Sequence, residues 1–195
     1  VWTPIGNKSN KYTGTFNGNN KTISGLYVND ENKQNIGLFG YVGTGCEIKS
    51  IGIINSYFNA LMFVGGVVGY AQGVTITNCY NTSFVNGQNY AGGVAGYAEE
   101  STVANCYNTG VVDGTDGFGG MIGWRLNLTI VNCYYLNTSC YIGIGNGSDS
   151  EGSVEAKTAE AFASGEVAYL LQGTQTEEIW GQKIGTDELP TIGGD

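Results

Sequence analysis

Apolar residues in this chain occur in short runs, and glycine, asparagine or aspartate interrupts them. In the stretch 93–112 three such runs follow one another, at 93–98, 102–107 and 110–112. A run of about five residues, at ~3.3 Å per residue, is long enough to span one side of a small coil. The pattern therefore predicts short β-strands joined by tight turns, with three strands in each coil.

These runs recur with a nearly constant period. Glycines three residues apart fall at 37/40, 66/69, 93/96 and 120/123, in steps of 29, 27 and 27 residues. Cys79, Cys106 and Cys133 recur every 27 residues in phase with the glycines, and Ile51 holds the matching place one coil earlier. A lone coil leaves its backbone N–H and C=O groups without partners, and stacking the coils in register satisfies them. The repeat predicts an all-β fold, a right-handed parallel β-helix with coils of about 27 residues.

Three asparagines precede the repeating cysteines, at positions 78, 105 and 132. Val103 and Cys106 differ in parity, so they cannot both point inward from a flat strand. A left-handed corner at Asn105, which asparagine tolerates, returns Cys106 to the interior. The three asparagines are then expected to form a hydrogen-bonded ladder, and Asn105→Ala is expected to destabilise the fold more than Asn108→Ala.

The Gly-Val-Val-Gly-Tyr and Gly-Val-Ala-Gly-Tyr cores at 66–70 and 93–97, each followed by Asn-Cys-Tyr, resemble GLUG repeats. Such repeats occur in large bacterial surface proteins and beside the catalytic domains of immunoglobulin-A-cleaving metalloproteases. The segments 2–26 and 162–190 resemble the lead-in and the closing segment of such arrays. The expected organisation is a lead-in coil or cap over 1–35, four GLUG-like coils over 36–140, and a loop plus a small helical C-terminal cap over 141–195.

Composition excludes several classes of function. The chain has eight basic and 17 acidic residues and a net charge of −9, too few cations for a nucleic-acid surface or an anionic membrane. No apolar stretch is long enough for membrane insertion. Histidine is absent, which removes His-based zinc sites and Ser-His or Cys-His nucleophiles. We expect no catalytic residue, metal or cofactor. The chain starts at Val1, without a signal peptide, and is read as a piece of a longer protein.

Two aromatic registers repeat with the coils, Tyr41, Tyr70, Tyr97 and Trp124 in one and Tyr80, Tyr107 and Tyr134 in the other. Rings stacked at the ~4.8 Å spacing of neighbouring strands could form a platform for sugar rings or peptide. Tyr70, Tyr97 and Trp124 are the candidate ligand-binding residues. The alternative is that the rings stack only because the coils do.

Carboxylates are the remaining candidates for chemistry, because some β-helical enzymes cut polysaccharides with acid pairs alone. Asp113 and Asp116 are expected in one inter-strand loop, 110–118, and Glu99 and Glu100 in another. Asn86 holds the place of Asp113 one coil earlier, so no acidic ladder forms.

The five cysteines are interpreted chiefly as buried, free thiols. Cys79, Cys106 and Cys133 form one interior file as small hydrophobes. Cys133 and Cys140 could instead close a small loop as a disulfide, and Cys46 has no obvious partner.

Three functions follow from these observations. The first is a non-catalytic, adhesin-like scaffold of a secreted protein at the bacterial cell surface or wall, with a host protein or glycan as partner. The second is a carbohydrate-binding module beside an enzyme. The third is a polysaccharide-cleaving β-helix that uses carboxylates.

Overall fold

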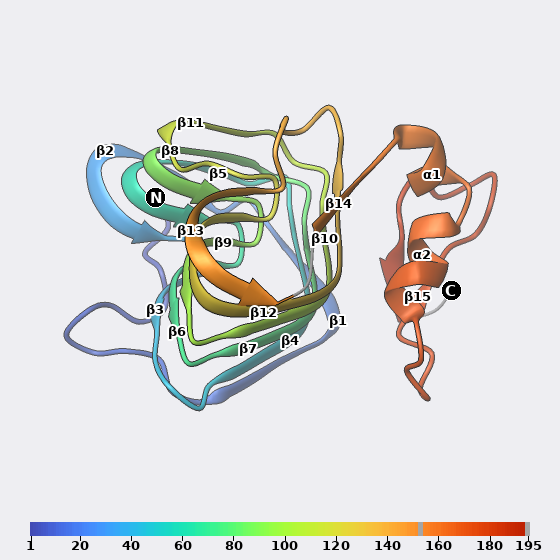
Figure 1. Cartoon of the computed structure of the whole chain (residues 1–195), viewed down its shortest axis with the longest axis horizontal. Coiled ribbons are helices and arrows are strands. Elements are labelled where there is room, and N and C mark those ends of the chain that lie inside the picture. Colours follow the sequence, from blue (N-terminus) through green and yellow to red (C-terminus); the bar gives the residue numbers. More distant parts are fainter. Residues whose placement is uncertain (152–153, 194–195) are drawn as a thin grey trace.

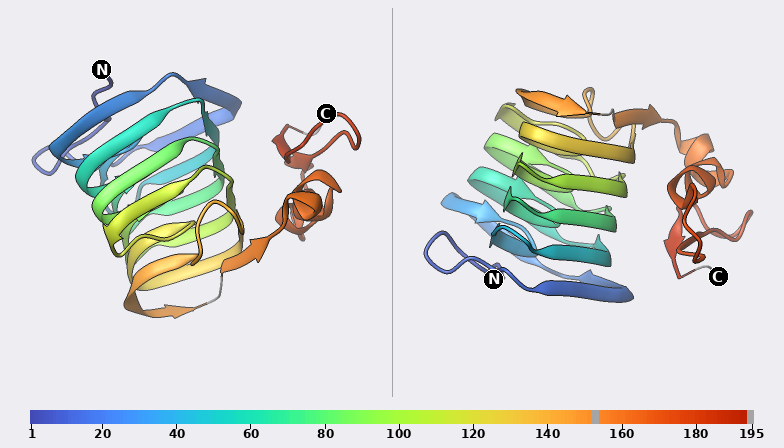
Figure 2. Two further views of the ribbon diagram at one scale, coloured as in Figure 1. Left: turned by 90° about the horizontal axis from the view of Figure 1, so that it is seen from above. Right: turned by 60° about the horizontal axis from the view of Figure 1, so that its bottom comes forward.

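The short apolar runs form strands on three faces of a right-handed stack of parallel coils (Figure 1). The structure is a computed structural model and describes residues 1–151 and 154–193. Each strand pairs in parallel with the strand one coil away, so the hydrogen bonds run along the stack (Figure 2). The predicted parallel β-helix is confirmed.

The three faces are named here after their first strands. The β1 face contains β1 (Thr15–Ser24), β4 (Glu47–Ile54), β7 (Thr75–Asn81), β10 (Thr102–Asn108), the second half of β12 (Ile122–Leu136) and β14 (Val154–Lys157). The β2 face contains β2 (Tyr27–Ile36), β5 (Tyr57–Gly65), β8 (Phe84–Gly92) and β11 (Val112–Asp116). The β3 face contains β3 (Phe39–Val42), β6 (Val68–Gln72), β9 (Ala95–Glu99), the first half of β12 and β13 (Ile144–Glu151).

The interior of the stack is apolar, and the cysteines lie in it as predicted. Ile51 pairs with Cys79, and Cys106 pairs with Cys133, so the four side chains occupy one column. All four are buried. The in-phase recurrence seen in the sequence is therefore a single file of side chains inside the coils.

The predicted left-handed corners are confirmed, with φ of 52° at Asn78 and Asn105 and 49° at Asn132. The ladder is formed between Asn132 and Asn105, whose Nδ2 and Oδ1 atoms are 3.0 Å apart. Asn78 departs from it. Its Nδ2 donates to Gln175 and its Oδ1 accepts from the Trp180 indole, because the C-terminal tail docks on this corner.

A second, fully buried pair of asparagines lies at the turn between the β1 and β2 faces. Asn81 Nδ2 donates to Asn108 Oδ1 at 2.8 Å, and Asn108 Nδ2 donates to the Gly110 carbonyl at 2.8 Å. The Gly110 N–H donates back to Asn108 Oδ1. Asn105 is only half-buried. From this geometry we predict the opposite order, with Asn108→Ala more destabilising than Asn105→Ala, because the interior amide is Asn108.

Two segments expected to be loops are strands. Asp113 and Asp116 lie in β11, which pairs with β8, and not in a loop over 110–118. Within 141–155, β13 and β14 pair with β12, apart from residues 152–153, which lie outside the described residues. Backbone pairing with the coil beneath extends the sheet despite the Gly/Ser/Asp-rich composition, because it satisfies hydrogen bonds whatever the side chains are.

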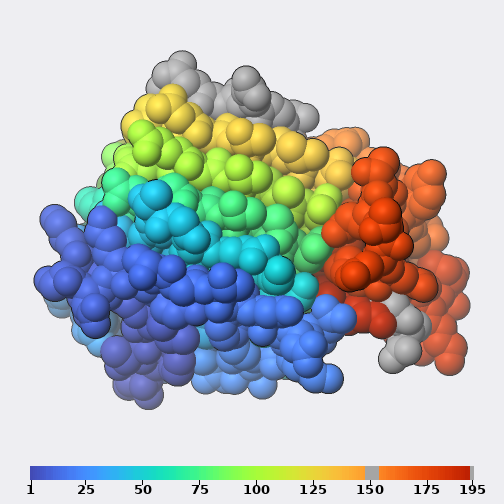
Figure 3. Space-filling view, turned by 90° about the horizontal axis from the view of Figure 1, so that it is seen from below, coloured from blue at the N-terminus to red at the C-terminus, as the bar shows by residue number. Residues whose placement is uncertain are grey.

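The tail consists of α1 (Ala159–Ala163), α2 (Glu166–Gln172), β15 (Trp180–Gly181) and β16 (Thr191–Ile192). Thr158 caps α1 by accepting from the Ala161 N–H, and Gly165, with φ of 86°, separates the helices. The sequence predicts short helical turns in this segment and predicts that they form a cap on the last coil. The tail instead lies along the side of the stack, against the β1 face (Figure 3).

Candidate binding surfaces

The first aromatic register is a continuous column of stacked rings on the β3 face. Centroids of Tyr41 and Tyr70, and of Tyr70 and Tyr97, are 4.4 Å apart, and those of Tyr97 and Trp124 are 4.5 Å apart. The interplanar angles are between 8° and 14°. The structure thus brings the three candidate ligand-binding residues together.

Stacking also occupies the ring faces that a sugar would need. Tyr70 lies between two neighbouring rings and so does Tyr97, while the Lys11 ammonium lies 4.7 Å from the centroid of Tyr41. Tyr70, Tyr97 and Trp124 are half-buried and present ring edges to solvent, while the Tyr97 hydroxyl donates to the Glu99 carboxylate at 3.3 Å. Burial raises the pKa of the Tyr70 and Tyr97 phenols further above neutral pH, so both hydroxyls are protonated under ordinary conditions. Ligand binding by Tyr70, Tyr97 and Trp124 stays a prediction, and it would rely on hydrogen bonds at the ring edges.

Phe63 and Tyr90 form a neighbouring column that the sequence analysis did not find. Their centroids are 5.6 Å apart, and Phe63 packs edge-on against Tyr70 and Tyr97. Both residues have left-handed backbone, with φ of 55° and 58°. The repeat could have revealed these corners. The equivalent positions one coil away are Asn35 and Gly117, and both residue types favour left-handed backbone.

The second aromatic register is covered by the tail. Tyr80 and Tyr107 stack at 4.9 Å, and Tyr107 packs against Phe162 and Trp180 with 1% of its surface exposed. Its hydroxyl donates to the Pro190 carbonyl at 2.8 Å. This register holds the tail on the stack, so it is not available as an open platform.

Tyr107→Phe is expected to lower the free energy of unfolding by about 1 kcal/mol, because it removes the buried hydrogen bond to Pro190. Tyr80→Phe is the matched control, since the Tyr80 hydroxyl forms no hydrogen bond within the described residues. Denaturant midpoints of the two variants give the measurement. Equal midpoints would show that the Pro190 contact does not stabilise the docked tail.

The acidic residues do not converge on a shared site. Asp113 pairs in register with Asn86, and its carboxylate accepts from the Gly114 N–H. Asp116 accepts from the Asn146 side chain at 3.2 Å. Within the described residues no three metal-ligating side chains lie close enough to hold an ion.

All five cysteines are free and buried, including Cys133 and Cys140. Burial raises the pKa of the Cys46 thiol to about 11 and that of Cys106 well above its ordinary value. Thiols of this kind are inert packing groups, because the thiolate is the reactive form.

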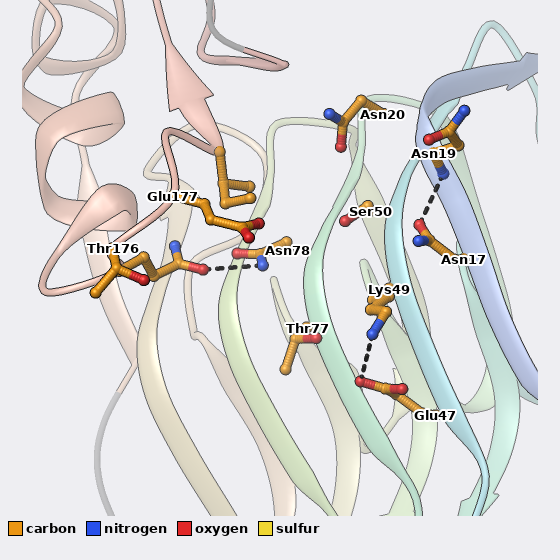
Figure 4. A pocket seen from close by; sticks show the side chains of 12 residues that line it. Asn17, Asn19, Asn20, Glu47, Lys49, Ser50, Thr77, Asn78, Thr176 and Glu177 are labelled. Atoms are coloured by element: carbon orange, nitrogen blue, oxygen red, sulfur yellow. Dashed lines mark hydrogen bonds and ion pairs between the residues drawn. The ribbon is translucent and has the colours of Figure 1, made fainter.

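A polar groove lies between the β1 face and the tail, with a volume of about 580 Å³ (Figure 4). One wall is the corner of the first coils and the other is the segment 175–179. Five amide side chains line it: Asn17, Asn19, Asn20, Asn78 and Gln175. The sequence analysis missed this groove, because it forms only when the tail docks beside coils that are distant in sequence.

Stacked parallel coils with strands in register define a β-solenoid repeat protein. Residues 87–113 match the family model described as "The GLUG motif", which confirms a GLUG repeat at that coil. No helix in the described part of the chain is long and apolar enough to cross a membrane.

A solved structure from Bacteroides ovatus, described as a "putative immunoglobulin A1 protease", has a similar fold. It aligns with a TM-score of 0.51 and 18% identity, over 91% of this chain and 76% of that one. A "Putative Gly-rich membrane protein" of Evansella cellulosilytica is 33% identical over 76 residues, which are 37% of this chain and 9% of that protein. The chain therefore spans a small part of this relative.

Proposed function

We propose that the chain is a non-catalytic, adhesin-like scaffold module of a secreted bacterial protein at the cell surface or wall. The observation that carries the proposal is the stack itself: strands pair in register from coil to coil on all three faces. Such a stack is rigid and holds its two ends at a fixed distance from each other. The GLUG repeat and the likeness to a Gly-rich membrane protein support a surface-associated role.

Polysaccharide cleavage is disfavoured by the placement of the acids. A glycoside hydrolase needs two carboxyl groups that flank the scissile bond, about 5–10 Å apart. Asp113 and Asp116 instead project from one exposed strand, and each already accepts a hydrogen bond.

A distance measurement and a turnover assay together test this function. Placed between two fluorescent reporter domains, the chain is expected to hold them at a narrow distance distribution, whereas a Gly/Ser linker of equal length gives a broad one. Polymeric glycan and protein substrates are expected to remain uncut. Turnover that Asp113→Asn or Asp116→Asn abolishes, or a distance distribution as broad as that of the linker, would contradict the scaffold role.

A further inference from the structure

The polar groove opens where the corner ladder is interrupted. Asn132 and Asn105 fill the corner of the later coils with their hydrogen-bonded amides. At the first coils Asn78 turns toward the tail, and Ser50, with φ of 56°, stands at the corresponding corner. A hydroxyl in place of an amide leaves space, and the docked tail encloses that space from the other side (Figure 4).

Several polar groups in the groove have no partner. The side chains of Ser50, Thr77 and Glu177 form no hydrogen bond or ion pair with other described residues, although Ser50 is buried. Figure 4 shows Glu177 close to Asn78, on the tail side of the groove. Ser50 is buried, Thr77 is half-buried and Glu177 is exposed, and the polar side-chain atoms of all three have hydrogen-bonding capacity available for a ligand.

The groove continues into a second hollow of about 530 Å³ between the first coil and the end of the tail. Asn19 and Asn20 line both hollows. Their left-handed backbone, with φ of 51° and 60°, places them at the register irregularity in the middle of β1, where the two hollows meet. Two adjoining hollows offer room for a short chain of rings as well as for a single ring.

The side chains that line the groove indicate which kind of ligand it can bind. An anion is disfavoured, because Lys49 already pairs with Glu47 at 3.1 Å and Glu177 adds a second carboxylate. Ile179 is the only apolar side chain among the lining residues, so the groove has no pocket for the apolar or aromatic anchor that peptide binding usually requires. Amides and hydroxyls both donate and accept, as do the hydroxyls of sugars.

We propose that this groove binds a short neutral oligosaccharide, with the side chains of Ser50, Thr77 and Glu177 and the amides of Asn19 and Asn20 as its hydrogen-bonding partners. The groove volume is within the range of about 300–1,000 Å³ found for small-ligand sites. The site is distinct from the aromatic column on the β3 face. It rests on its own geometry and does not depend on the scaffold role.

Calorimetric titration with neutral trisaccharides of β-linked glucose, β-linked N-acetylglucosamine and α-linked mannose tests the proposal. We expect saturable binding of at least one of them at millimolar concentration. Thr77→Trp fills the groove and is expected to weaken that binding at least about tenfold. Thr75→Trp is the matched control, because Thr75 lies two residues away on β7, is exposed and is outside the groove lining. Glu177→Gln is expected to weaken binding, and Glu178→Gln to leave it unchanged.

Thermal unfolding of each variant shows whether it is folded. If Thr77→Trp does not fold, Glu177→Gln still tests the proposal. The proposal is overturned if no neutral trisaccharide binds, if binding survives both groove variants, or if a peptide library binds the groove and sugars do not. If Trp124→Ala loses sugar binding and the groove variants keep it, the binding site is the aromatic column and not the groove. Polysaccharide turnover would refute the scaffold function and leave this site untouched.

Discussion

Gly93→Ala is expected to destabilise the protein by about 3 kcal/mol or more, a large part of the stability of a typical domain. A Cβ atom at this position would overlap the Asn108 side chain and the carbonyl oxygen of Gly120. The first is a buried amide fixed by three hydrogen bonds, and the second is backbone of the next coil. Neither can move without breaking the register of the stack. Chemical denaturation monitored by circular dichroism provides the measurement.

Gly43→Ala serves as the control for this variant. The nearest atoms to a Cβ atom at Gly43 would be side-chain atoms of Lys11 and Thr13, at 3.2 Å. The lysine can move, so we expect a change below about 1 kcal/mol. A Gly93→Ala protein with the midpoint of the Gly43→Ala protein would show that the coils tolerate a wider spacing at this column.

Asn108→Ala is expected to cost about 2–4 kcal/mol, and more than Asn105→Ala. Removing the Asn108 amide leaves the N–H and carbonyl groups of Gly110 unpaired in the interior and takes a hydrogen bond from Asn81. Asn105→Ala loses one half-buried hydrogen bond and places alanine at a φ of 52°, which together cost about 1.5–3.5 kcal/mol.

Urea midpoints of both variants give the comparison. Asn105→Gly separates the two contributions at the corner, because glycine keeps the left-handed backbone without strain. Should Asn105→Ala prove the more damaging change, the corner ladder, and not the buried amide pair, would be the main polar support of the stack.

The features that repeat in phase could be predicted from sequence. Cys79, Cys106 and Cys133 share one environment because a parallel stack gives residues one period apart the same neighbours, so their spacing alone sets their position. Left-handed backbone at Asn105 followed from side-chain parity. The stacking of Tyr70, Tyr97 and Trp124 followed from the same period.

Features that depend on what covers a residue could not be predicted in this way. The period predicts one column of rings that contains Tyr97 and another that contains Tyr107, but it does not reveal that only the Tyr107 column lies beneath the tail. Asn108 was ranked below Asn105 because the sequence does not reveal which amide faces inward. The groove at Ser50 needs the tail as its second wall, and no periodicity links residues 50 and 177.

The lateral position of the tail changes how the stack loses structure. In a simple array each coil contacts only its neighbours, so the ends can fray one coil at a time. Here β16 contacts β4, the Trp180 indole is bonded to Asn78 of β7, and α2 contacts both β10 and β12. One segment thus joins coils that do not touch each other. Loss of an end coil would also remove contacts that hold this segment against the other coils, so we expect a single cooperative melting transition, as in a globular domain.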